Sequence, residues 1–254
     1  MNDSSGELYK SLSEQQLKNT KRLSELKKKI KEIANPDIAD TMQWFFKTGK
    51  GEYGEGDVFV GLKVPTQRKL ARAFGDLTLG DLKRLLNSPI HEERLISLFI
   101  LIHKYDKGNE KDRSKIFSFY LKNIKGINNW DLVDLSAPKV VGNYLLDKDK
   151  SLLEKFANSH NLWKRRIAIL STHEFIKSNR FDTTLKIARI LLKDEHDLIH
   201  KAVGWMLREI GKRDLKTEEK FLKVYYKKMP RTMLRYAIEK FPEAKRKKYL
   251  QNKI

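Results

Sequence analysis

The chain contains no cysteine, only 6 prolines and 13 glycines among its 254 residues, and no long uninterrupted apolar run. Without cysteine there is no disulfide framework, no thiol nucleophile and no thiolate metal site. The apolar runs are too short to cross a membrane, and the opening MNDSSGELYK lacks the hydrophobic segment of a signal peptide. We therefore expect a cytoplasmic protein, associated with the nucleoid and not with a membrane.

Acidic residues are also in short supply. Lys and Arg number 53 against 33 Asp and Glu, which gives a formal net charge of +20. Such an excess is self-repulsive, and the usual reason for it is a polyanionic partner, although a solubilising lysine-rich surface is an alternative. Hydrophobic residues make up 40% of the chain and aromatic residues 10%, which indicates a folded protein with a substantial core.

The pattern of apolar residues is helical along most of the chain. The single β-like run, residues 58–64, has no second strand to pair with. Residues 10–33, within an N-terminal region 1–35, predict a basic amphipathic helix, and residues 49–57 predict a flexible glycine-rich loop. Further helices are predicted after Pro36 and from Pro65, and then at 79–87, 90–104, 111–122, 130–146, 150–158, 161–177, 181–193, 196–212, 215–228, 230–240 and 242–251.

A repeat underlies these helices. Five segments align with one another, at residues 93–105, 129–141, 164–176, 199–211 and 234–241. The alignment places Ser97, Val133, Ala168, Ala202 and Ala237 at one equivalent position, with spacings of 36, 35, 34 and 35 residues. A near-constant period with one helix pair per unit is typical of a HEAT-like or armadillo-type α-solenoid. We therefore predict a single all-α domain over residues 1–254, in which the second helices of the pairs line a concave basic groove.

Three of these second helices carry candidate functional side chains. Residues 196–212 place Lys201, Trp205, Arg208 and Lys212 on one face, at offsets 0, 4, 7 and 11, opposite the apolar face. An aromatic ring among basic residues is typical of a nucleic-acid surface, although a tryptophan that covers a helix–helix seam is the alternative. Residues 130–146 carry Trp130 and Asp134 on one face, and residues 161–177 offer Lys164, Arg165 and Arg166, for which a solvated basic face is the alternative.

Two further motifs are judged fortuitous. Gly49–Gly54 matches the spacing G-x-G-x-x-G, but it follows a helix and its acidic neighbours would repel a phosphate. His196 and His200 have the spacing of a zinc-binding helix, but no third ligand is evident. We expect neither a metal ion nor a cofactor.

The chain resembles a known family over nearly its whole length from about Ile38. Five ordered segments carry the resemblance: VFVGLKVPTQRKLAR at 58–72, NNWDLVD at 128–134, NLWKRRIAIL at 161–170, KAVGWMLREIGK at 201–212 and PRTMLRYAIEKF at 230–241. They are similar to segments of the bacterial AlkD-like DNA alkylation repair glycosylases, whose fold is a HEAT-like solenoid. The resemblance implies a monomeric glycosylase that removes positively charged alkylated purines, such as N3-methyladenine and N7-methylguanine, from double-stranded DNA.

The resemblance also implies roles for individual residues. Asp134 falls on the family's catalytic aspartate, Trp130 and Trp205 on the tryptophans that flank the lesion, and Arg166 on the arginine of the groove. Phe45 takes the place of a tyrosine close to the lesion. The remaining basic residues of the three helices, Lys164, Arg165, Lys201, Arg208 and Lys212, are expected to contact DNA phosphates.

A non-catalytic module that binds DNA structures is the alternative function, because a basic groove survives the loss of chemistry. The carboxylate of Asp134 favours the enzyme, since a purely electrostatic DNA-binding surface has no use for it. A protein-binding solenoid would need an apolar concave face, which the stripe from Lys201 to Lys212 argues against.

Overall fold

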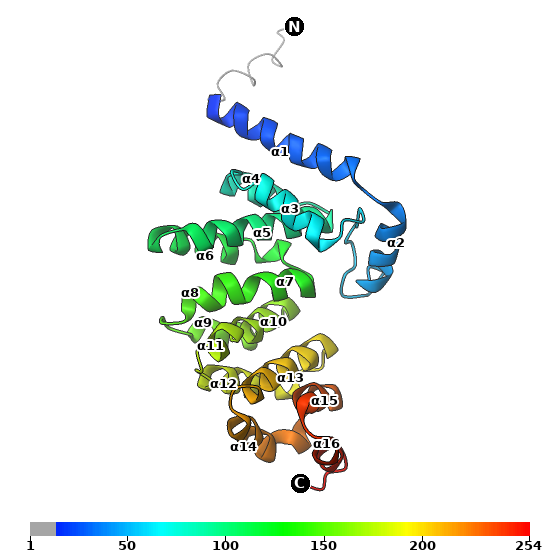
Figure 1. Ribbon diagram of the computed structural model, residues 1–254, viewed down its shortest axis with the longest axis vertical. Coiled ribbons are helices and arrows are strands. Elements are labelled where there is room, and N and C mark those ends of the chain that lie inside the picture. The colour runs from blue at the N-terminus through cyan, green and yellow to red at the C-terminus, as the bar shows by residue number, and fades with distance from the viewer. Residues whose placement is uncertain (1–13) are drawn as a thin grey trace. The chain divides into compact units, whose positions relative to one another are not determined.

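The computed structural model describes residues 14–254, and these are helical apart from turns, short loops and one isolated parallel β-bridge between Val58 and Ile90 (Figure 1). The chain divides into two compact units, the first ending at Asn109 and the second covering Glu110–Ile254. No helix within residues 14–254 is both long and apolar enough to span a bilayer.

The described part of the first unit, residues 14–109, has five helices: α1 (Glu14–Glu32), α2 (Pro36–Phe45), α3 (Val64–Ala73), α4 (Leu79–Leu86) and α5 (His91–Lys107). Local signals in the sequence set their starts. The Asn35 side chain accepts the backbone N–H of Ile38 and so caps α2, which Pro36 opens. Thr78 and Asp81 form a reciprocal capping box at the start of α4.

The loop between α2 and α3 is fixed to α5 by buried charged groups. Asp57 binds His91 Nδ1 at 2.9 Å and accepts a hydrogen bond from Arg94 at 2.6 Å. The fully buried Glu92 carboxylate accepts the backbone N–H groups of Val60, Gly61 and Leu62. The segment that joins the glycine-rich loop to α3 is therefore held by α5.

The second unit contains the remaining helices. They are α6 (Glu110–Lys122), η1 (Ile124–Gly126), α7 (Trp130–Ala137), the π-helical turn η2 (Pro138–Gly142), α8 (Asn143–Leu145), α9 (Ser151–Ala157), α10 (Leu162–Ser171), α11 (His173–Lys177), α12 (Asp182–Ile190), η3 (Leu191–Lys193), α13 (Asp197–Gly211), α14 (Leu215–Tyr225), η4 (Tyr226–Lys228), α15 (Arg231–Ala237), η5 (Ile238–Lys240) and α16 (Glu243–Leu250).

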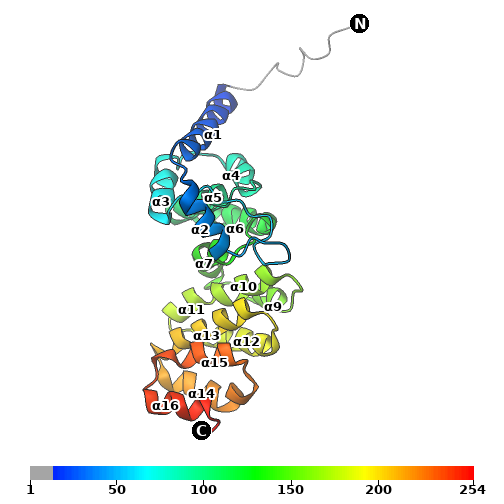
Figure 2. The same cartoon turned by 90° about the vertical axis from the view of Figure 1, so that its right-hand side faces the viewer.

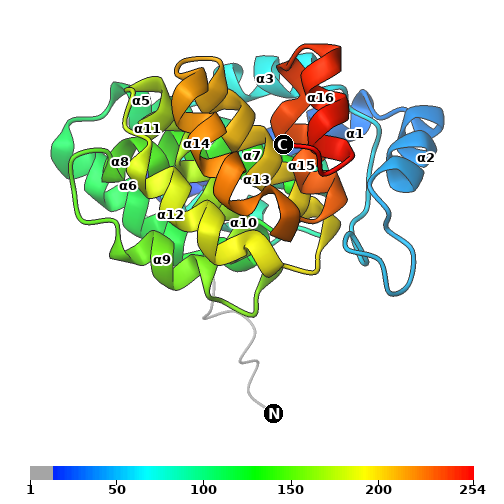
Figure 3. The ribbon, with the colours of Figure 1, turned by 90° about the horizontal axis from the view of Figure 1, so that it is seen from below.

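Helices α7, α10, α13 and α15 pack side by side in that order, each against the next (Figure 2). Helices α9 and α12 form a second layer next to them, as the view along the stack shows (Figure 3). This arrangement of stacked helix pairs is that of a HEAT-like α-solenoid and confirms the predicted fold class.

The five anchor residues of the predicted repeat, Ser97, Val133, Ala168, Ala202 and Ala237, all have completely buried side chains. Glycine brings two helices of the second unit even closer to their neighbours. A β-carbon at Gly204 would lie 2.4 Å from the carbonyl oxygen of Met233, and one at Gly142 would lie 2.1 Å from that of Ser171. Small residues therefore set the spacing between successive repeats.

The predicted helix boundaries in the second unit agree with the structure to within one or two residues, with two internal differences. The helix predicted at 161–177 is divided at Thr172, whose hydroxyl donates to the carbonyl oxygen of Ile169. The helix predicted at 130–146 contains the π-helical turn, which begins at Pro138 because proline has no N–H for the regular α-helical ladder. Residues 10–13 of the predicted first helix lie outside the described residues. The single domain, the concave groove and the flexibility of residues 49–57 stay predictions.

Candidate active site and nucleic-acid interface

Helix α7 presents Trp130 and Asp134 on a half-buried face. The buried Asn129 caps the helix, and its side-chain oxygen accepts the N–H of Trp130 at 2.8 Å. On the opposite side, the Ser136 hydroxyl uses its one proton to donate to the carbonyl oxygen of Leu132. In its 2.9 Å hydrogen bond with the buried Tyr120 hydroxyl, Ser136 is therefore the acceptor and Tyr120 the donor. These contacts fix the orientation of α7 and therefore the direction in which Asp134 points.

Asp134 is paired with Arg166 of α10. Arg166 Nε donates to Asp134 Oδ1 at 2.7 Å and Nη2 donates to Oδ2 at 2.7 Å, while Nη1 donates to the carbonyl oxygen of Leu198 in the first turn of α13. The side chain of Arg166 is 5% exposed and that of Asp134 is 14% exposed. One guanidinium group therefore joins three neighbouring helices of the stack, α7, α10 and α13, and it binds the carboxylate in a bidentate arrangement.

The ionisation of Asp134 reflects two opposing influences. The pKa of its carboxyl group is raised, because burial outweighs the charge and hydrogen bonds of Arg166, which lower it, and the charge of Asp131 raises it further. A carboxylate offers about four lone-pair positions, of which Arg166 occupies two. The remaining positions can still accept a hydrogen bond from a water molecule or face a developing positive charge.

Trp205 lies about two turns further along α13 than Leu198, roughly 10 Å by helical rise, and its ring is half-buried. Its indole N–H donates to Glu209 Oε1 at 3.0 Å, and its ring centroid is 6.2 Å from that of His173. Burial, and after it the charge of Lys177, lower the pKa of His173. Glu209 is not among the predicted site residues, although its position one helical turn after a tryptophan is a usable signal.

The predicted basic stripe of α13 is only partly exposed, because the Arg208 side chain is 16% exposed, and each of its cations has an acidic partner. Lys201 pairs with Asp197 at 2.6 Å, Lys212 with Glu209 at 2.6 Å, and Arg208 with Glu239. Lys201 and Lys212 are 41% and 45% exposed. A phosphate can replace Asp197 at Lys201 at little cost, and the Lys212 ammonium group has further donors for a phosphate while it keeps Glu209.

The three basic residues at the start of α10 do not share one role. Lys164 is half-exposed, with its ammonium group 5.8 Å from the centre of the Phe156 ring. The Arg165 guanidinium binds Asp194 at 2.6 Å and donates to the carbonyl oxygens of Ser159 and His160.

Arg165 and Arg166 both have partners inside the protein, and their predicted contacts with DNA stay predictions. Both guanidinium groups are engaged inside the protein, because each meets an aspartate and a backbone carbonyl on neighbouring segments. Of this trio, only Lys164 is placed as an exposed phosphate contact would be.

The comparisons with known proteins decide the family. A family model described as DNA alkylation repair enzyme matches residues 26–241. The chain belongs to this family. No curated protein matches the chain significantly.

Among solved structures, the predicted DNA alkylation repair enzyme from Enterococcus faecalis is similar, with a TM-score of 0.65 and 17% identity over 83% of this chain and 97% of that chain. At this identity the likeness shows the fold. The smu.31 protein from Streptococcus mutans aligns over 87% of this chain and 100% of that chain, at 17% identity and a TM-score of 0.49.

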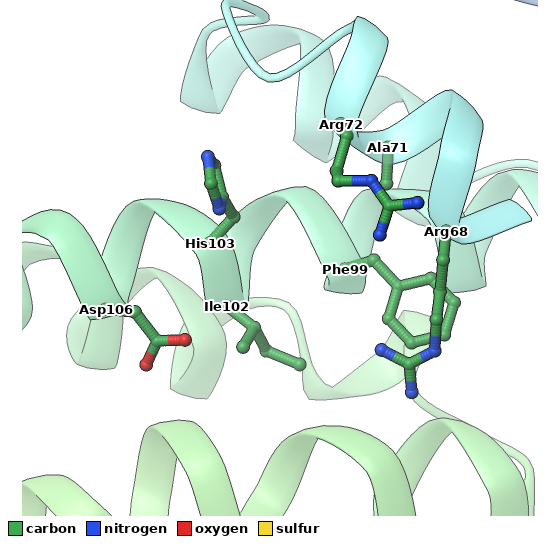
Figure 4. Close-up of a pocket in the computed structure, with 7 residues that line it drawn as sticks. All are labelled: Arg68, Ala71, Arg72, Phe99, Ile102, His103 and Asp106. Atoms are coloured by element: carbon green, nitrogen blue, oxygen red, sulfur yellow. The ribbon is translucent and has the colours of Figure 1, made fainter.

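The first unit of this DNA alkylation repair family member carries its own aromatic and basic groups. Phe45 is 56% exposed at the end of α2, and its ring meets the edge of Phe46 at 5.2 Å. A separate pocket of about 190 Å³ lies between α3 and α5 (Figure 4). The Arg68 guanidinium stacks on Phe99 there, 4.1 Å from the ring centre, and Arg72 points into the same space.

The two motifs judged fortuitous have structural explanations. The amides of Gly49 and Gly51 are taken by the loop's own Glu52 and Glu55 carboxylates, so they are not free to cradle a phosphate. His196 caps α13 by accepting the N–H of Leu198, and His200 contacts the carbonyl oxygen of Asp194. Within the described part of the chain, no group of three His, Cys, Asp or Glu side chains could hold a metal ion.

Proposed function

We propose that this protein is a DNA glycosylase that excises positively charged alkylated purines, N3-methyladenine and N7-methylguanine, from duplex DNA. The observation that carries the proposal is the geometry of Asp134, an almost buried carboxylate whose orientation is fixed by Arg166 and which still has unused lone pairs. Membership of a DNA alkylation repair family supports the substrate class.

The chemistry suits such a site. Alkylation of a purine ring nitrogen places a positive charge on the base and makes it a good leaving group, so no general acid is needed. As the N-glycosidic bond breaks, positive charge develops on the sugar. A fixed carboxylate stabilises that charge and can orient the attacking water, as in glycoside hydrolysis. Because Arg166 holds Asp134 before the substrate arrives, little reorganisation is required during the reaction.

The aromatic and basic residues supply binding. The indole faces of Trp130 and Trp205 can attract a cationic nucleotide, each by about 0.5–2 kcal/mol. Lys164, Lys201, Arg208 and Lys212 are the phosphate contacts of the second unit. In the first unit we add Arg68 and Arg72, two cations that line one pocket together with Asp106.

A non-catalytic DNA-binding module is the second candidate, and one observation favours it. A carboxylate in a purely electrostatic DNA-binding groove would be repulsive, and catalysis is one reason for its presence. The bidentate pair with Arg166 supplies a structural reason instead, because it joins α7 to α10. Asp134 alone therefore does not separate the two functions, and an experiment must.

The test is release of methylated purines from alkylated duplex DNA by the wild-type protein and by Asp134→Asn. We expect the variant to bind DNA at least as well as wild type, because one repulsive charge is removed. Its excision rate should fall by roughly two orders of magnitude, the scale for loss of a preorganised electrostatic group. Asp194→Asn is the matched control, since Asp194 is also a buried partner of an arginine but lies outside the site. No release by wild type would favour the binding module, and equal loss in both variants would indicate a structural effect.

A further inference from the structure

The indole of Trp205 is held by a carboxylate rather than by a neutral acceptor. Glu209 Oε1 accepts the indole N–H at 3.0 Å, and the same oxygen accepts the Lys212 ammonium group at 2.6 Å. The Glu209 side chain is only 17% exposed, and Arg208 Nε lies 3.8 Å from it. The one polar atom of the indole therefore meets an anion that two cations of the same helix keep in place.

Glu209 is ionised at neutral pH. Burial acts to raise the pKa of its carboxyl group, but the hydrogen bond and charge of Lys212, the hydrogen bond of Trp205 and the charge of Arg208 outweigh burial and lower the pKa below its usual range. A hydrogen bond from an N–H group to an ionised carboxylate is stronger than one to a neutral oxygen, and it polarises the donor.

That polarisation has a direction that matters for a cationic ligand. Cation–π attraction depends on the negative face of the aromatic ring. An anion that accepts the indole N–H shifts electron density from the N–H bond into the ring, so the face of Trp205 becomes more negative. The ring then attracts a positive charge more strongly than the same ring would beside a neutral acceptor.

We propose that Glu209 is a positioning and specificity-determining residue that acts through Trp205, fixing the plane of the indole and favouring a positively charged nucleotide over an uncharged one of the same shape. This inference rests on the proposed function, in which Trp205 contacts the lesion nucleotide. It assigns the choice between damaged and normal purines partly to a residue that need not touch DNA.

The test uses two duplexes that resist cleavage. One contains N7-methylguanine with a fluorine on the 2′ carbon of the sugar, which keeps the cationic base in place. The other contains 7-deaza-7-methylguanine, which has the same shape without the charge. The measured quantity is the ratio of the two dissociation constants for wild type, Glu209→Gln and Glu209→Ala. Glutamine can still accept the indole N–H, so it separates charge from geometry.

We expect wild type to prefer the cationic duplex, and Glu209→Gln to reduce the preference about three- to tenfold, within the range of a cation–π contribution. Glu209→Ala should reduce it at least as much. Glu239→Gln is the matched control, because it removes a carboxylate from the same stretch of surface without touching Trp205, and it should leave the ratio unchanged. The proposal is overturned if Glu209→Gln has the same ratio of dissociation constants as wild type, or if wild type does not prefer the cationic duplex.

A spectroscopic measurement checks the contact itself. The indole N–H resonance of Trp205, assigned by its absence in Trp205→Phe, should move upfield in Glu209→Gln. In wild type it should shift in the acid range as Glu209 is protonated. A resonance that follows neither change overturns the contact on which the proposal depends.

Failure of this inference is distinguishable from failure of the proposed function. Base release by wild type together with an unchanged ratio in Glu209→Gln rejects the role of Glu209 and keeps the glycosylase. No base release, with a ratio that depends on Glu209, rejects the glycosylase and keeps the selective contact.

Discussion

Asp134 and Glu218 are two carboxyl groups of the second unit with little solvent exposure, and they differ in their hydrogen-bond partners. Both Oδ atoms of Asp134 receive a hydrogen bond from Arg166. Glu218 on α14 is 1% exposed, its Oε1 has no hydrogen-bond partner, and its other oxygen lies against Gly211. Burial and the charge of Glu219 raise the pKa of Glu218 to about 8, although Arg208 and Lys245 act in the opposite direction.

The comparison shows what makes a buried carboxylate available for chemistry. Desolvation favours the neutral acid at both positions. Of these two groups, only Asp134 has a guanidinium group against both oxygens, so only there do hydrogen bonds from a cation favour the ionised form. Arg166 is therefore the residue that sets Asp134 apart from Glu218.

The most disruptive change should be Arg166→Ala, which would leave Asp134 in the situation of Glu218. Removal of one partner from a buried ion pair costs about 3–5 kcal/mol, because the other charge stays buried without compensation. Urea unfolding should show this loss as a lower midpoint with an unchanged slope. The double variant Arg166→Met/Asp134→Asn should recover part of the stability, and failure to recover any would attribute the cost to packing.

Glu218→Gln should remove a pH dependence of stability. The pKa of Glu218 is about 8 in the folded protein, against an ordinary value of 4.5. Between these values the native state binds more protons than the unfolded chain. The contribution of Glu218 to the free energy of unfolding of the wild type therefore has its full value below pH 4.5. It falls as the pH rises toward 8, by at most about 1.4 kcal/mol per pH unit. Thermal melts from pH 5 to 8 measure the slope, which should be shallower in the variant. Parallel slopes would contradict the assignment.

Trp205→Ala should separate the surface role of this ring from a packing role. The side chain is half-buried, so we expect its truncation to cost clearly less than the roughly 3–5 kcal/mol of a fully buried tryptophan. Excision and the preference for cationic nucleotides should both fall. Trp163→Ala, at a buried tryptophan of α10, is the control expected to show the full loss of stability. Equal losses in the two melting temperatures would favour the packing role.

The smallest effects should come from the exposed cations. Lys201→Ala, Lys212→Ala and Arg68→Ala should each weaken DNA binding several-fold at low salt, independently of sequence. Each should reduce the slope of log affinity against log salt by about 0.9 for one lost phosphate contact. Arg165→Lys, at a guanidinium engaged by Asp194, should leave that slope unchanged. A change in the salt slope for Arg165→Lys and none for Lys201→Ala would show that Arg165, and not Lys201, contacts a phosphate.

The sequence predicted what local periodicity determines. The five small or compact anchors of the repeat are buried as expected, and the helix starts follow their caps. It could not assign different roles to Lys164, Arg165 and Arg166, because consecutive helical residues point about 100° apart and only the neighbours decide which of them is buried. Those neighbours, Asp194 and Asp134, lie 29 and 32 residues away in sequence.

The three-way contact of Arg166 also bears on how the second unit opens. In a stack of repeats, the backbone amide hydrogens of each helix pair exchange with solvent at a rate set largely by the stability of that pair and of its interfaces. The repeats at the ends of the stack therefore open first. Because one guanidinium group is bonded to the repeat before it and the repeat after it, α7, α10 and the first turn of α13 cannot separate one at a time without exposing a charge. Their amides should therefore lose protection from hydrogen exchange together, as one cooperative block, while α14 to α16 exchange independently. An opening of α14 to α16 alone would then leave the carboxylate of Asp134 in place.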